Sequence, residues 1–114
     1  MAFQKLARAD EILPGRTLFL RVGEAAVILA NWEGRIYALH GLCPHQNNSL
    51  EGAVLWDNLL DCPFHHFQFA VQTGENRFPK NVYPDDMPHL EPQVRPLRTY
   101  AVEVRDGDIW VDLG

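Results

Sequence analysis

The sequence has few cysteines, no long apolar run and no cluster of basic residues. Only two of its 114 residues are cysteine. Its longest apolar runs, such as residues 25–30, are far shorter than the roughly 20 residues that a membrane-spanning helix needs. The ten Lys and Arg residues are scattered and the formal net charge is −5, which argues against a nucleic-acid partner. We therefore expect neither a membrane nor a nucleic acid among its partners.

We also expect no signal sequence, no helical segment and no second domain. The first residues of the chain, 1–5, do not form the apolar core of a signal peptide. No stretch carries sustained helical periodicity, which favours an all-β fold. A chain of 114 residues supports a single domain, residues 1–114, and leaves no room for a separate catalytic domain.

Short strand-like segments separated by turn signals run along the chain. Strands are expected over residues 3–6, 16–22, 25–32, 35–40, 53–56, 59–61, 67–71, 97–105 and 109–113. Turns are expected at Glu33-Gly34, Asp57-Asn58, Thr73-Gly74 and Asp106-Gly107. Five prolines fall between residues 79 and 96, so residues 76–96 are expected to contain neither a strand nor a helix.

The alternation of the last two strand-like segments predicts part of the core. The side chains expected to be buried are Tyr100, Val102, Val104, Ile109 and Val111. The three tryptophans lie in strand-like contexts and are expected to pack in or against the core; they are Trp32, Trp56 and Trp110.

Two Cys/His pairs contain both cysteines of the chain: Cys43-Pro44-His45 and Cys62-Pro63-Phe64-His65. Two thiolates and two imidazoles are a ligand set for zinc or for an asymmetrically bound iron–sulfur cluster. Zinc sites usually pair like ligands, whereas each half here holds one cysteine and one histidine. A [2Fe–2S] cluster has two irons. If the cysteine of each pair binds one iron and the histidine of each pair binds the other, the two pairs become geometrically equivalent. No cysteine then remains for a disulfide, which fits a reducing cytoplasm.

This pattern of C-x-H followed by C-x-x-H resembles the Rieske family of iron–sulfur proteins. The likeness continues through the aromatic Phe69. The resemblance implies an all-β Rieske fold, with an antiparallel β-sandwich or barrel base and a cluster-binding subdomain of two loops, residues 41–70. It also implies one Rieske [2Fe–2S] cluster. By this resemblance the inner iron is held by Cys43 and Cys62, and the outer, redox-active iron by His45 and His65.

The resemblance further implies a ferredoxin of a multicomponent aromatic-ring or alkene oxygenase. Such a protein is an electron carrier, not an enzyme, and docks transiently with a flavoprotein reductase that uses NAD(P)H and with a terminal oxygenase. The sequence around His45, with Gln46 after it, resembles ferredoxins of diiron hydroxylases, which favours a diiron monooxygenase over a ring-hydroxylating dioxygenase. Phe67 and Phe69 stand where high-potential relatives carry hydroxyl donors, so a potential toward the lower end of the roughly −150 to +300 mV Rieske range is expected.

Other interpretations of the same residues remain open. The chain also resembles the Rieske-like small subunit of nitrite reductase. A structural zinc module, a hydrolase with a cysteine nucleophile, or two plain core cysteines would use the same side chains. His66 lies beside His65 and would compete with it as a ligand, although the spacing favours His65. His40 and His89 are expected to be surface or loop residues.

Overall fold

The computed structural model describes residues 3–42, 49–62, 68–78 and 97–113. The regular structure of these residues is β-strand, apart from one short 3-10 helix, η1 (Ala9–Glu11). Within these ranges no helix is long and apolar enough to cross a membrane. The predicted all-β class is confirmed.

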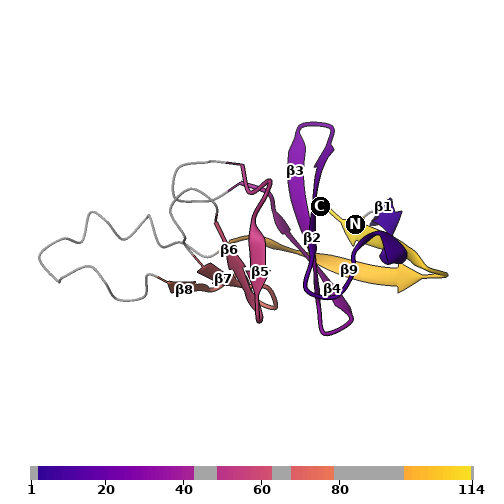
Figure 1. Ribbon diagram of the computed structural model, residues 1–114. Coiled ribbons are helices and arrows are strands. Elements are labelled where there is room, and N and C mark those ends of the chain that lie inside the picture. Colours follow the sequence, from indigo (N-terminus) through magenta and orange to yellow (C-terminus); the bar gives the residue numbers. More distant parts are fainter. Residues whose placement is uncertain (1–2, 43–48, 63–67, 79–96, 114) are drawn as a thin grey trace, which may run out of the picture.

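Six strands form one antiparallel sheet in the order β1-β10-β9-β4-β3-β2. They are β1 (Phe3–Arg8), β2 (Thr17–Val22), β3 (Ala25–Trp32), β4 (Arg35–His40), β9 (Thr99–Arg105) and β10 (Asp108–Asp112). The start of β9 pairs with β4 through Thr99 and Tyr100, and the rest of β9 pairs with β10. Figure 1 shows β2, β3 and β4 running across the direction of β9. Strand β9 therefore joins two differently oriented parts of the large sheet.

The apolar composition of β3 follows from its position between two cores. Ile28 and Ala30 belong to one cluster of buried side chains, the first core cluster. Val27 and Leu29, which point to the opposite face, belong to a second core cluster. A strand that is buried on both faces reads as a continuous apolar run instead of an alternating one. The run at residues 25–30 is thus the centre of the fold.

A second, smaller antiparallel sheet has the order β5-β6-β7-β8. Its strands are β5 (Val54–Trp56), β6 (Leu59–Asp61), β7 (Gln68–Ala70) and β8 (Asn76–Phe78). The expectation that residues 76–96 contain no strand is wrong for β8, which pairs with β7. The prolines begin only at residue 79, so β8 keeps every backbone N–H for pairing. Residues 79–96 lie outside the described part of the chain.

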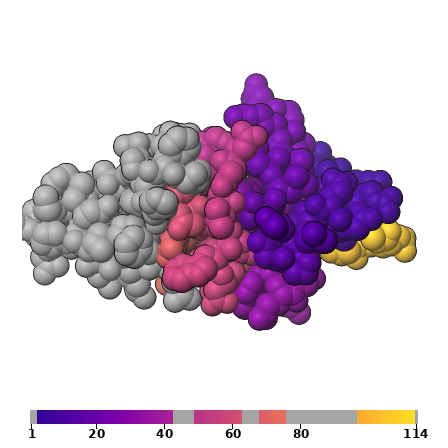
Figure 2. Space-filling view, viewed as in Figure 1, coloured from indigo at the N-terminus to yellow at the C-terminus, as the bar shows by residue number. Residues whose placement is uncertain are grey.

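The two sheets share the first core cluster. The large sheet and the segment before β9 contribute Ile28, Ala30, Leu39 and Leu97, and the small-sheet region contributes Leu50, Ala53, Leu60, Cys62, Phe69 and Val71. The Thr17 hydroxyl donates a hydrogen bond to the Ala53 carbonyl over 3.0 Å. Figure 2 shows the magenta surface of the small sheet directly beside the purple surface of the large one. The small sheet is therefore fixed on the large sheet by a common core.

Two of the predicted core residues are exposed. Ile109 and Val111 are fully buried as predicted, but Val104 is 52% exposed. Val104 lies in the part of β9 beyond its pairing with β4, where the β9–β10 hairpin extends past the body of the sheet (Figure 1). Trp56, also expected to pack, is 66% exposed on β5. Strand β5 is an edge strand of the small sheet, paired on one side only among the described strands.

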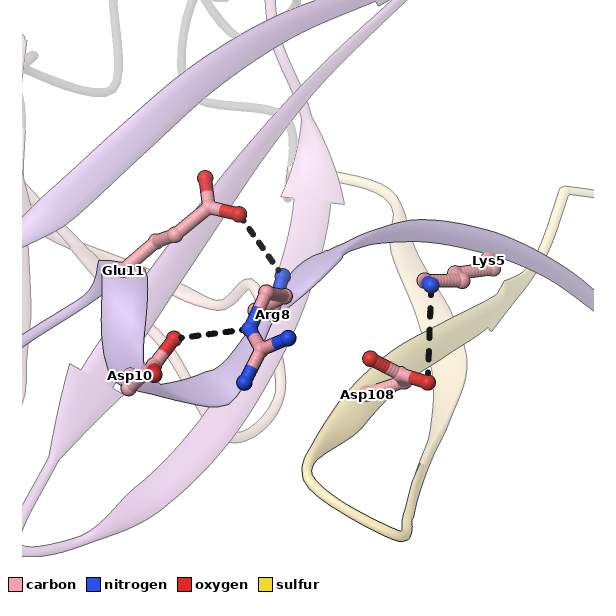
Figure 3. Close-up of polar contacts among 5 residues, drawn as sticks. All are labelled: Lys5, Arg8, Asp10, Glu11 and Asp108. Carbon is pink, nitrogen blue, oxygen red and sulfur yellow. Dashed lines mark hydrogen bonds and ion pairs between the residues drawn. The ribbon is translucent and has the colours of Figure 1, made fainter.

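Charged side chains form ion pairs near the pairing of β1 with β10. Lys5 Nζ lies 3.5 Å from Asp108 Oδ2, and Arg8 Nε lies 3.3 Å from Asp10 Oδ1 (Figure 3). The backbone N–H of Arg8 donates to Glu11 Oε1 over 3.1 Å. Solvent-exposed pairs of this kind contribute only about 0–1 kcal/mol each to stability. The join between the first and last strands therefore rests mainly on their backbone ladder and the second core cluster.

Candidate metal centre

Cys62 directly follows β6 and is fully buried in the first core cluster. Its thiol is free of any disulfide. Its position is fixed by the pairing of β6 with β7, in which Asp61 lies opposite Gln68 and accepts a 3.1 Å hydrogen bond from the Gln68 side-chain amide. Cys62 therefore stands at the base of the segment that carries His65.

The first Cys/His pair lies between two residues that the structure holds together. Leu42 and Ser49 form an antiparallel bridge. The Leu50 N–H donates to the Gly41 carbonyl over 2.8 Å, and the Leu50 side chain is fully buried in the first core cluster. The segment that carries Cys43 and His45 thus begins and ends at one point of the fold. Because Leu50 and Cys62 belong to the same core cluster, the two Cys/His segments share a common base.

Gly41 permits the close approach that places this base. Its N–H donates to the Ala26 carbonyl over 2.8 Å. A Cβ at Gly41 would lie 2.8 Å from backbone atoms of Ala26 and Val27, and 2.9 Å from the Phe19 ring. Such distances are too short for any side chain, so glycine is required two residues before Cys43. The Cys/His motif gave no signal for this residue.

His40, at the end of β4, is not the plain surface histidine that was predicted. It is half-buried, and its Nδ1 forms a 3.3 Å hydrogen bond with the Tyr100 hydroxyl. Its backbone N–H donates to the Arg98 carbonyl over 2.8 Å. Burial, and then the positive charge of Arg98, lower the pKa of His40 below its ordinary value of 6.5. His40 is therefore a half-buried residue that links the end of β4 to the start of β9.

The lowered pKa of His40 gives a pH-dependent contribution to stability. Between the folded and unfolded pKa values the unfolded state binds more protons, so stability falls as the pH drops from above 6.5 toward the folded value. Urea unfolding midpoints of the wild type are expected to decrease over this range, and less so for His40→Asn. Equal slopes for both proteins would contradict the assignment to His40.

Of the four predicted ligands, the structure describes Cys62 alone. Cys43, His45 and His65 lie outside the described residues, as do His66, His89 and Phe67. Among the residues that the structure does describe, no three His, Cys, Asp or Glu side chains gather as a metal site. The complete ligand set therefore stays a prediction. What is described fits it, because a buried, unpaired thiol stands where the motif requires a thiolate ligand.

The model of the Rieske [2Fe–2S] domain family matches residues 2–100. The chain belongs to the Rieske family. The predicted Rieske fold and the predicted [2Fe–2S] cofactor are confirmed by this match. A structural zinc module and a cysteine hydrolase are thereby set aside. When bound, a Rieske cluster accepts and donates one electron at a time.

Known Rieske ferredoxins resemble the chain over much of its length. The ferredoxin component of the alkene monooxygenase system of Xanthobacter autotrophicus is 42% identical over 74 residues, 64% of this chain and 61% of that relative. The 3-phenylpropionate/cinnamic acid dioxygenase ferredoxin subunit of Escherichia coli K12 is 35% identical over 96 residues, 82% of this chain and 79% of that relative. In a solved complex of reduced oxygenase and oxidized ferredoxin in carbazole 1,9a-dioxygenase, one chain superposes with a TM-score of 0.77. It is 27% identical, and 96% of this chain and 100% of that chain are covered.

These relatives are ferredoxin components of oxygenase systems. The Rieske protein described here is accordingly an electron carrier of the ferredoxin type, as predicted from its sequence. The described residues show what supports the two motif segments. The β6–β7 pairing and the Leu42–Ser49 bridge fix the bases of the two motif segments on one shared core.

Proposed function

We propose that this Rieske ferredoxin passes single electrons from an NAD(P)H-dependent flavoprotein reductase to a terminal oxygenase, and that this oxygenase is a diiron monooxygenase. The choice of oxygenase depends on the sequence identity of this chain to a monooxygenase ferredoxin and to a dioxygenase ferredoxin. The identity is 42% over 74 residues with the alkene monooxygenase ferredoxin and 35% over 96 residues with the E. coli dioxygenase ferredoxin. The His45-Gln46 sequence of the first motif points the same way.

For the cluster we propose four ligands in a single domain, residues 1–114. Cys43 and Cys62 hold the inner iron, and His45 and His65 hold the outer iron. Full burial of Cys62 supports the inner position, since an inner iron lies on the side of the protein core. The cluster-binding subdomain, residues 41–70, is supported by the common base that Leu50 and Cys62 share.

Docking with reductase and oxygenase is proposed to be transient. An electron carrier must leave one partner before it meets the next, so small and weak interfaces suit it. A cytoplasmic location is proposed on the ground that both cysteines serve as ligands and leave none for a disulfide.

Electron transfer to isolated oxygenases tests the proposal. The dithionite-reduced protein is mixed with the terminal oxygenase of the alkene monooxygenase system or with that of a biphenyl dioxygenase, and reoxidation is followed by visible absorption. Faster reoxidation by the alkene monooxygenase component is expected. Faster reoxidation by the dioxygenase component would overturn the choice of oxygenase, and reoxidation by neither would overturn the carrier function.

The midpoint potential is expected toward the lower end of the roughly −150 to +300 mV Rieske range. Hydrogen bonds to the cluster sulfurs raise the potential by stabilising the reduced, more negative state. Phe69 is fully buried in the same core cluster as Cys62 and offers no donor. Protein-film voltammetry measures the potential, and Phe69→Tyr is expected to raise it. A wild-type midpoint well above zero would contradict the prediction.

A further inference from the structure

Three of the four strands of the small sheet lie in a part of the sequence that has no basic residue. Residues 36–76 contain no Lys or Arg, although the chain has ten of them. The same stretch contains four acidic residues: Glu51, Asp57, Asp61 and Glu75. Strands β5, β6 and β7 all fall within it. The residues from β5 to β7 therefore carry acidic side chains and no Lys or Arg, whereas β8 contains Arg77.

Two large apolar side chains project from the outer face of this sheet. Val54 is 64% exposed and Trp56 is 66% exposed. Between them, Leu55 points inward and packs against the first core cluster. The register confirms this alternation, because Leu55 lies opposite the fully buried Leu60 while Trp56 lies opposite the half-buried Leu59. Figure 2 shows the magenta residues of this region at the surface.

The patch also lies close to the start of the second motif. Val54 pairs with Asp61, the residue that immediately precedes Cys62. Among the residues that the structure describes, two other large apolar side chains are comparably exposed, Leu13 at 64% and Val104 at 52%, but they lie before β2 and on β9. A partner seated on Val54 and Trp56 would thus be held beside the second motif, whereas one seated on Leu13 or Val104 would contact the large sheet.

We propose that Val54 and Trp56, with the acidic Glu51 and Asp57 flanking them in the chain, form the docking surface for the terminal oxygenase. This inference rests on the proposed function. The complementary surface on the oxygenase is an apolar recess with Lys and Arg side chains around it. Tryptophan is the residue type most often found to dominate interface energetics, and a ring of charges around it steers association and fixes orientation. A solved complex of a similar ferredoxin with its oxygenase favours the electron acceptor as the occupant over the reductase.

Surface variants test the proposal with a matched control. Trp56→Ser and Val54→Ser remove the apolar patch, while Val104→Ser makes the same change as Val54→Ser at an exposed site on the large sheet. Reoxidation of each reduced protein is measured against increasing concentrations of whichever oxygenase accepts electrons from the wild type. Trp56→Ser is expected to weaken the apparent affinity about tenfold, as loss of an interface anchor does. Val54→Ser is expected to weaken it less, and Val104→Ser to leave it unchanged.

Further readouts separate the possible outcomes. Absorption spectrum and midpoint potential should stay unchanged in all three variants, since none alters the proposed ligands. Asp57→Asn should reduce the dependence of the association rate on salt. Wild-type affinity in both patch variants would overturn the docking surface while leaving the carrier function intact. Weaker binding of the reductase alone would also overturn it, by assigning the patch to the electron donor. A wild type that reduces no oxygenase would overturn the function and the inference together.

Discussion

Replacing Cys62 with serine is expected to abolish cluster binding. A hydroxyl is a poor ligand for iron, and an iron–sulfur site that loses one thiolate loses the free energy that binding contributes to folding. The serine would also leave a hydroxyl in a fully buried, apolar environment, which costs about 1–3 kcal/mol when it has no partner. Iron content, visible absorption and the EPR spectrum of the reduced protein measure the loss.

Val71→Ala is the control that separates lost core packing from lost cluster binding in Cys62→Ser. Val71 is 1% exposed and belongs to the same core cluster as Cys62. Its truncation is expected to cost about 2 kcal/mol of stability, without changing any proposed ligand. The variant should therefore bind iron normally and unfold at lower urea concentration. A Cys62→Ser protein with normal iron content and an unchanged EPR spectrum would contradict the ligand assignment.

Gly74→Ala is expected to be the most destabilising substitution among the glycines that the structure describes. Gly74 has a positive φ of 76°, and a Cβ there would overlap the carbonyl oxygen of Leu97. The Gly74 carbonyl accepts a 2.7 Å hydrogen bond from the Leu97 N–H, which sets the start of the closing strand beside β7. Backbone strain and the clash each cost about 1–3 kcal/mol, so a loss of about 2–6 kcal/mol is expected. Urea unfolding followed by loss of the cluster absorption measures it.

Gly52→Ala separates backbone strain from the clash. Gly52 also has a positive φ, 86°, but a Cβ there would meet no atom within 4 Å. Its substitution should cost only the conformational penalty of about 1–2 kcal/mol. The difference between the two variants then isolates the contact with Leu97. Equal unfolding midpoints would show that this contact does not hold the closing strand.

Local patterns predicted the strands and hairpins well. The segment at residues 25–32 was placed correctly because β-branched and apolar residues end at the Glu33-Gly34 turn, which has positive φ at both positions. The second motif was placed at the end of β6 because a short apolar segment precedes it. These signals are contained in neighbouring residues, so a single sequence reveals them.

Features that depend on distant partners were missed. Val104 and Trp56 have the apolar character of core residues, and only the arrangement of the sheets shows that they are largely exposed. His40 becomes half-buried because Tyr100, sixty residues later in the chain, reaches its imidazole. Gly41 is required by backbone atoms of β3, which no motif around the cysteines reveals. The short strand β8 was hidden by the prolines that follow it.

The order in which the sheet strands occur in the chain has a consequence for biosynthesis. Strand β1 pairs with β10 from Phe3 opposite Asp112, and Leu97 completes the core that encloses Cys62. While the polypeptide is still being made, the early hairpins can form, but the core around Cys62 is incomplete until Leu97 has been synthesised. Contacts between residues so far apart in the sequence also form slowly. Iron and sulfide delivery is therefore expected to follow synthesis of the whole chain, and a truncated or stalled product should remain colourless.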